Sequence, residues 1–179
     1  MTRKLSRRNL LTLGAAGALA GCGFQPVYMR TASGLAGPAQ RELAAIDVNR
    51  IPDRPGQLLR QDLQERLGAD SDAAVHRYDL VVGFGITGEG IGILQDNNAT
   101  RVRLIGTATW TLKAKDAAQT QITSGSARSM DAINIFDQQY FAADLDNEQV
   151  QRRLASALAD QIAMQLAVFF RHRAAVASN

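Results

Sequence analysis

Two histidines and one cysteine are the side chains of this sequence best suited to nucleophilic catalysis or metal binding. His76 lies in a polar stretch before an alternating segment, and His172 lies in a basic stretch near the C-terminus. Neither has a second histidine or a cysteine at the spacing that a zinc site or a nucleophile and base pair requires. We therefore predict no metal site, no cofactor and no catalytic residues.

Two further patterns could suggest catalysis or nucleotide binding, and their sequence context argues against both. The run 83–88 fits GxGxxG, but a phosphate-binding loop must open a helix, and Glu-Gly-Ile-Gly follows at 89–92. We interpret these glycines as relieving the end of a strand or allowing another backbone to approach closely. Helix caps and turns explain a scattered group of aspartates, namely Asp131, Asp137, Asp144 and Asp146. An enzyme is not expected, although a convergent pair of titratable groups in a closed pocket would favour a hydrolase.

Basic side chains offer a different chemistry, because guanidinium and ammonium groups bind phosphates. In the segment 101–113, every second side chain would lie on the same side of a strand. Arg101, Arg103 and Lys113 then share one side, with threonines between them, and Lys115 follows. A face with cations at both ends and small hydroxyl side chains would suit contact with a wall or with a phosphorylated lipid. An ordinary solvated sheet face remains the simpler interpretation of the pattern alone.

The elements that must carry these residues follow from hydrophobic periodicity. Alternating apolar and polar residues predict strands at 78–87, 101–113 and 120–132, the last two joined by a loop at 115–119, and a short β-like stretch lies within 41–51. Leucines at 59, 63 and 67 predict a helix over 57–67, ended by Gly68. A longer apolar stripe predicts a helix over 147–171, formed by Val150, Leu154, Leu158, Ile162, Leu166 and Phe169.

This order of elements predicts an α+β domain, with two helices packed on one face of a four-stranded, mostly antiparallel or mixed sheet. The other face would remain open to solvent or a partner. We expect that open face to include small residues from the outer strands, namely Val81, Gly83, Gly85, Thr123, Gly125, Ala127 and Ser129.

The first residues have the three parts of an export signal: a basic head, an apolar run at 10–20 and a cleavage site of small residues. The 11-residue run is too short for a membrane span, which needs about 20 residues. Leu19-Ala20-Gly21-Cys22 resembles the lipobox of bacterial lipoproteins, which makes Cys22 the expected lipid attachment site. Arg7 and Arg8 also resemble a twin-arginine signal, so the general secretory route and the twin-arginine route both remain open.

The expected organisation is a signal peptide at 1–21, an acylated N-terminus and flexible tether at 22–40, one domain at 41–171 and a tail at 172–179. Cleavage would remove 21 of 179 residues and four of the 20 basic residues but none of the 17 acidic ones, which leaves 158 residues with a net charge of about −1. The high isoelectric point therefore belongs largely to the signal, and no nucleic-acid partner is expected.

Several segments in order resemble the lipopolysaccharide-assembly lipoprotein family LptE. They are Cys22-Gly23-Phe24-Gln25-Pro26-Val27-Tyr28, Gly90-Ile91-Gly92-Ile93, Thr100-Arg101-Val102-Arg103, Ala108-Thr109-Trp110-Thr111-Leu112 and Gln139-Tyr140-Phe141-Ala142. The resemblance implies two helices on a four-stranded sheet and an outer-membrane lipoprotein, anchored through N-terminal acyl chains, that plugs and helps to assemble the β-barrel LptD. It also implies assistance in lipopolysaccharide insertion into the outer leaflet, and Gly23 after the anchor cysteine fits sorting to the outer membrane.

Basic residues on the sheet and its loops are linked to lipopolysaccharide binding in that family. The matching positions here are Arg101, Arg103, Lys113 and Lys115. The alternative is an accessory lipoprotein of another envelope lipid-transport complex, which would pair with an inner-membrane complex instead of an outer-membrane barrel.

Overall fold

The computed structural model describes residues 37–68, 75–93, 99–134 and 140–177. The signal segment, Cys22 and the tether up to residue 36 lie outside these ranges, as does Asp137. The described elements, in chain order, are α2 (Pro38–Ala44), β1 (Ile46–Val48), α3 (Arg54–Leu67), β2 (Tyr78–Ile93), β3 (Ala99–Ala114), β4 (Gln121–Asn134) and α4 (Tyr140–Ala177).

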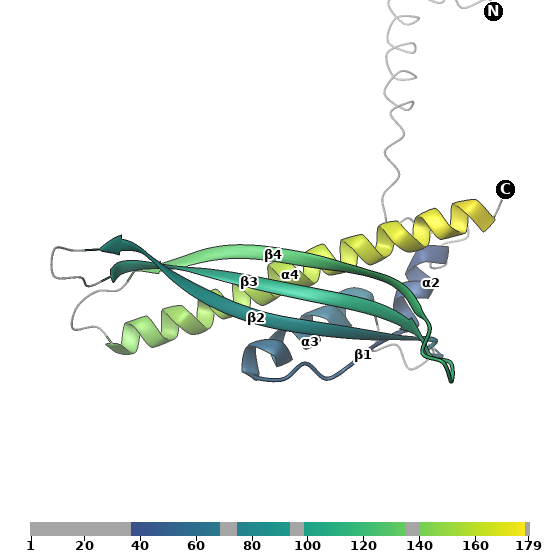
Figure 1. Ribbon diagram of the computed structural model, residues 1–179, viewed down its shortest axis with the longest axis horizontal. Coiled ribbons are helices and arrows are strands. Elements are labelled where there is room, and N and C mark those ends of the chain that lie inside the picture. Colours follow the sequence, from purple (N-terminus) through teal and green to yellow (C-terminus); the bar gives the residue numbers. More distant parts are fainter. Residues whose placement is uncertain (1–36, 69–74, 94–98, 135–139, 178–179) are drawn as a thin grey trace, which may run out of the picture.

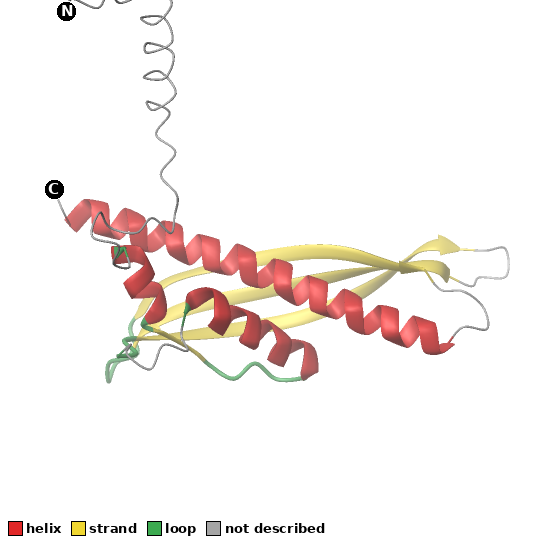
Figure 2. Ribbon diagram, turned by 180° about the vertical axis from the view of Figure 1, so that it is seen from behind, coloured by secondary structure: helices red, strands yellow, loops and turns green. Residues whose placement is uncertain are grey.

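The four strands form one mixed sheet in the order β1-β2-β3-β4. β1 runs parallel to β2, whereas β2–β3 and β3–β4 are antiparallel. Figure 2 shows α2, α3 and α4 on one side of the sheet, and Figure 1 shows the other side without a helix over it. The predicted α+β architecture, with helices on one face, is confirmed, except that the described residues form three helices there instead of the predicted two.

The helix α4 is the main cover of the sheet and runs along its length (Figure 2). Its buried side chains recur every four residues, so the predicted stripe is confirmed except at its end, where Phe170 is buried and Phe169 only partly so. That row consists of Val150, Leu154, Leu158, Ile162, Leu166 and Phe170. The helix extends beyond the predicted range at both ends, and residues 172–177, expected as a tail, form its last turns.

The helix α3 matches the predicted leucine spacing, since Leu59, Leu63 and Leu67 are almost fully buried. It begins at Arg54, three residues before the predicted start, because Pro55 fits the first turn of a helix, where its missing N–H costs no hydrogen bond. It ends at Gly68, whose φ of 71° is a left-handed conformation that glycine adopts without a steric penalty.

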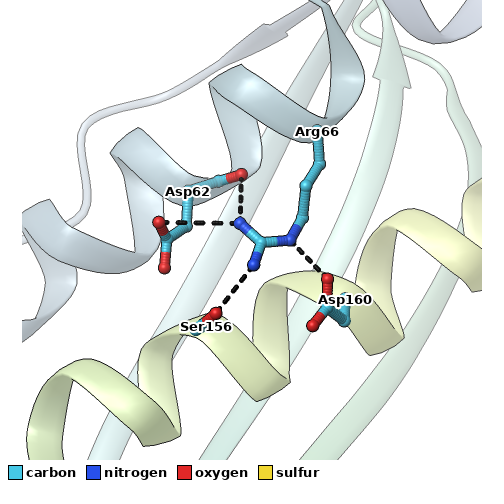
Figure 3. A network of polar contacts seen from close by, with 4 residues as sticks. All are labelled: Asp62, Arg66, Ser156 and Asp160. Atoms are coloured by element: carbon cyan, nitrogen blue, oxygen red, sulfur yellow. Dashed lines mark hydrogen bonds and ion pairs between the residues drawn. The ribbon is translucent and has the colours of Figure 1, made fainter.

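Arg66 links α3 to α4 through several polar contacts, as Figure 3 shows. The Arg66 guanidinium donates hydrogen bonds to Asp160, to the Ser156 hydroxyl at 2.7 Å and to the Asp62 carbonyl at 3.0 Å. Burial lowers the pKa of this group, but the two carboxylates outweigh burial and hold the pKa above its usual value. Arg66 therefore remains charged and links two helices that are far apart in the sequence.

The N-terminal part of the domain differs from the sequence prediction. Residues 38–44, assigned to the end of the tether and to a β-like stretch, form α2, and the strand is confined to Ile46–Val48. Ala39 and Leu43 are buried one helical turn apart, and α2 packs against α4. Packing stabilises this helix, because a seven-residue helix is unstable alone.

The glycine-rich run is part of a strand and not a nucleotide-binding loop. Residues 83–92 lie inside β2, which continues to Ile93, so no helix starts there. The interpretation that these glycines mark the end of a strand is wrong. At 16 residues each, β2 and β3 are far longer than the usual strand of five or six residues.

Candidate functional site

The side of the sheet without helices, here called the open face, is the candidate functional surface. The predicted positions on β2 and β3 are confirmed, because Val81, Gly83 and Gly85 pair with Thr111, Thr109 and Thr107 on this side. Arg101 and Arg103 lie on the same side of β3 and are exposed. The open face therefore combines small residues and threonines with arginines at one end.

The predicted orientation of β4 is wrong. Thr123, Gly125, Ala127 and Ser129 pair with the helix-facing residues Leu112, Trp110, Ala108 and Gly106, so they face α4. The open face of β4 instead carries Ser124, Ser126, Arg128 and Met130. Because side chains alternate along a strand, a change of one residue in register exchanges the two faces completely.

A tryptophan fixes the face that β4 presents to α4. Trp110 is buried and lies over Gly125, where an added Cβ would come within 2.6 Å of the indole ring. The Trp110 Nε1–H donates a hydrogen bond of 3.0 Å to the Gln165 side chain of α4. No side chain other than hydrogen fits between the ring and β4 without a shift, so Gly125 belongs under the helix.

One end of the open face has a shallow hollow of about 520 Å³, here called the distal hollow. Its lining comes from the end of β2, the start of β3 and the end of β4. Figure 1 shows these strand ends on the side of the molecule where α4 begins. The lining of the hollow combines two guanidinium groups with exposed apolar side chains. The lining residues are Ile91, Arg101, Arg103, Met130, Asp131 and Ala132.

The charge of the distal hollow comes mainly from its arginines. Asp131 is engaged by Arg153 of α4 at 2.6 Å. Burial raises the pKa of Asp131, but hydrogen bonds from Arg153 and from the Ala132 N–H bring it below its usual value. Within the described ranges, the ion pair of Arg103 is a long contact of 3.7 Å with Glu89. A positive, partly apolar hollow suits an amphipathic anion, with phosphate at the guanidinium groups and hydrocarbon near Met130.

The two lysines proposed with these arginines lie at the other end of β3. Twelve residues separate Arg101 from Lys113, which corresponds to about 40 Å along a strand. Lys115 forms ion pairs with Asp47 at 3.2 Å and Asp79 at 3.5 Å, and the hydrogen bond to Asp47 leads the contacts that raise its pKa. The structure thus brings Arg101 and Arg103 together but separates them from Lys113 and Lys115.

The sequence prediction did not identify the apolar part of the distal hollow. Ile91 lies beyond the strand predicted at 78–87, and Met130 belongs to the strand whose predicted face is wrong. If the alternation that begins at Tyr78 is extended to Ile91, the two-residue period of a strand places Ile91 on the open face. Met130 gave no such signal, because its neighbours on β4 are small and polar.

The polar residues considered for catalysis are spread over separate elements and do not form one described cluster. His76 precedes β2, His172 lies in the last turns of α4 instead of a tail, and Asp144 and Asp146 belong to the first turns of α4. Among the described residues, His, Cys, Asp and Glu nowhere gather in a group of three that could hold a metal ion. Within the same residues, no helix has the length and apolar character needed to cross a membrane.

The chain resembles known proteins both in sequence and in fold. The profile of a family described as "LptE: Lipopolysaccharide-assembly" matches residues 43–166, which is more than half of the chain. A comparison with curated proteins gave no match. A lipoprotein from Caulobacter crescentus CB15 is similar in structure, with a TM-score of 0.60 at 20% identity over 74% of this chain and 96% of that one.

Rare lipoprotein B from Shewanella oneidensis has a TM-score of 0.52 at 14% identity, over 69% of this chain and 92% of that one. At these identities the two structures support the fold alone. The match of the family profile begins at the end of α2 and continues through most of α4, so it includes the whole sheet and the distal hollow.

Proposed function

The chain belongs to the LptE lipopolysaccharide-assembly family, which is non-catalytic, and from this we propose that it is the lipoprotein plug of an LptD-type β-barrel. Membership makes it a lipoprotein involved in lipopolysaccharide assembly, and this role is consistent with a location in the cell envelope. In the proposal, acyl chains on Cys22 hold it at the outer membrane. It helps the barrel to assemble and assists the insertion of lipopolysaccharide into the outer leaflet.

The one-sided packing of the sheet supports a role as a plug. The helices cover one face, while β2 and β3 present glycines and threonines over much of the other face. Such a surface allows close approach of another wall, because its side chains are short and its hydroxyl groups can form hydrogen bonds. We therefore assign the central open face to the barrel wall.

The distal hollow supports direct contact with lipopolysaccharide, and this observation carries the proposal for the lipid. Lipopolysaccharide combines phosphates with acyl chains, and the hollow combines Arg101 and Arg103 with Ile91 and Met130. We retain Arg101 and Arg103 as the main candidate residues and Lys113 as a separate, weaker contact. Lys115 already has two carboxylate partners, so we assign it to holding β1 and β2 against the β3–β4 turn.

The lipid role is tested by replacing Arg101 and Arg103 together with alanine and measuring capture on immobilised lipopolysaccharide. Charged hydrogen bonds contribute about 1.5–3 kcal/mol each when buried, and partial exposure reduces this, so we expect capture to weaken roughly tenfold. The matched control, Lys113→Ala with Lys115→Ala, removes the same charge from the other end of β3 and should weaken capture less. Unchanged capture by the Arg101 and Arg103 variant would remove the lipid role of the hollow.

The plug role is tested by purifying the mature protein from membranes and identifying its partners. An LptD-type barrel in stoichiometric amount is the expected result. Recovery of an inner-membrane lipid-transport complex without a barrel would instead favour an accessory lipoprotein of another envelope transporter. Mass spectrometry of the N-terminal peptide would test acylation of Cys22 independently of either partner.

A further inference from the structure

The C-terminal part of α4 has an exposed apolar ridge that the plug role does not explain. Met164, Val168 and Val176 are 50%, 45% and 65% exposed, and His172 completes their four-residue spacing. This ridge runs parallel to the buried row of α4. Residues at this spacing lie on one side of a helix, so the four side chains form one continuous strip, here called the α4 ridge.

Basic residues flank the α4 ridge. Arg171 and Arg173 are exposed beside it, and no acidic residue occurs from 161 to 177. Arg41 of α2 is exposed in the helix that packs against α4. An apolar strip bordered by cations is typical of helices that lie in the interface of an anionic membrane.

The position of the ridge brings it near the proposed anchor. Figures 1 and 2 show α2 beside the C-terminal end of α4, with the described chain beginning there. Buried Ala39 and Leu43 hold α2 in place. Only 15 residues separate Cys22 from Pro38, a reach of at most about 55 Å. A membrane that holds Cys22 is therefore within reach of the α4 ridge.

We propose that the α4 ridge docks on the anionic phospholipid headgroups of the leaflet that holds the acyl anchor. Met164, Val168 and Val176 enter the interface, and Arg171 and Arg173 bind lipid phosphates. Docking orients the domain, because it fixes one end of the molecule at the membrane and leaves the distal hollow at the other end. The inference rests on the proposed acylation of Cys22, but it does not require the barrel.

The test uses mature acylated protein that carries an environment-sensitive nitrobenzoxadiazole label on Val168→Cys or Val176→Cys. Cys22 is the only native cysteine, and acylation blocks its sulfur, so the label reports one position. The protein is placed in vesicles of phosphatidylethanolamine and phosphatidylglycerol that contain a nitroxide-labelled lipid as quencher. Glu65→Cys on α3 is the matched control, because it is also exposed on a helix but lies outside the ridge.

We expect quenching at 168 and 176 but not at 65, and much weaker quenching in vesicles of phosphatidylcholine. With about 1 kcal/mol for each basic residue near an anionic surface, Arg171→Gln with Arg173→Gln should lower the ratio of docked to undocked protein roughly 30-fold. Val176→Asp, read by a label at 168, should also reduce docking. It changes an exposed side chain and so tests the ridge even if the arginine variant is unstable.

Three results would overturn the proposal. They are no quenching at 168 and 176, equal quenching with and without phosphatidylglycerol, and quenching that appears only after addition of a barrel partner. Mass spectrometry of the N-terminal peptide separates these from failure of the proposed function, since loss of the acyl anchor removes the protein from the vesicles altogether.

Discussion

Replacing Gly125 with alanine tests how β4 is seated under α4. The new Cβ would lie 2.6 Å and 2.8 Å from two carbons of the Trp110 ring and 3.0 Å from the Gln165 side-chain oxygen. The ring cannot move aside freely, because Trp110 is only 4% exposed and belongs to the core. Either the ring or β4 must therefore shift.

The expected loss of stability follows from these contacts. Overpacking a core by one methyl group costs about 1–3 kcal/mol, and loss of the hydrogen bond from Trp110 to Gln165 adds about 1 kcal/mol. The lower entropy of the unfolded alanine variant returns about 0.4–1 kcal/mol. We expect the free energy of unfolding to fall by about 1–3.5 kcal/mol, which lowers Tm by roughly 2–14 °C for a domain of this size.

The assay is urea unfolding followed by tryptophan fluorescence, since Trp110 is the only tryptophan and reports on the site itself. Gly85→Ala is the matched control, because no atom lies within 4 Å of its added Cβ on the open face. That variant should keep its stability or gain up to about 1 kcal/mol. Equal losses in the two variants would refute the seating of β4 described here.

Two further predictions concern links between the helices and their surroundings. Arg66→Ala should lower the free energy of unfolding by about 1–2 kcal/mol, because Asp160, Ser156 and the Asp62 carbonyl lose their common hydrogen-bond donor. The control, Arg152→Ala on the exposed side of α4, should change this free energy little. Equal effects of the two variants in urea unfolding would argue against the link. Burial raises the pKa of Asp131, but Arg153 holds it below its unfolded value, so the ion pair stabilises the fold above about pH 4. This stabilisation is lost as pH falls through the folded pKa of Asp131. Asp131→Asn should therefore flatten the acid side of the stability profile, and a profile identical to that of the wild type would contradict the assignment.

The fold could be predicted where side chains contrast strongly. Leucines every four residues identified α3, a stripe of apolar residues at similar spacing identified most of α4, and alternating large apolar residues identified β2 and β3. The faces of β4 could not be assigned from its sequence, because Gly125 and Ala127 differ little in polarity from Ser124 and Ser126. Their burial depends on the size of Trp110 and on Gln165, which lies 55 residues from that tryptophan. The short α2 was missed for a similar reason, since packing on α4 stabilises it.

The candidate site was predictable only in part for a related reason. Alternation along β3 correctly placed Arg101 and Arg103 on one side, but sequence spacing does not show whether a cation already has a partner. Asp47 lies 68 residues before Lys115, and the pairing of β1 with β2 brings it within 3.2 Å. A prediction based on charge alone therefore treats Lys115 and Arg101 as equivalent, although Lys115 already forms ion pairs with two carboxylates.

The contacts of α4 with the edge of β4 explain why the open face, and not the sheet edge, is the more suitable binding surface. Gln161 bonds to both the N–H and the carbonyl of Arg128, and Gln165 donates to the Ser126 carbonyl at 3.0 Å. Exposed strand edges pair readily with other chains, and these two glutamines occupy the hydrogen-bonding groups of β4 at its middle. A partner that added a strand there would have to displace both glutamine side chains. Displacement of Gln165 would also remove the hydrogen-bond acceptor of the Trp110 Nε1–H. Contact through the threonines and glycines of the open face requires neither change, so the proposed barrel wall can approach that face while α4 keeps its place on the sheet.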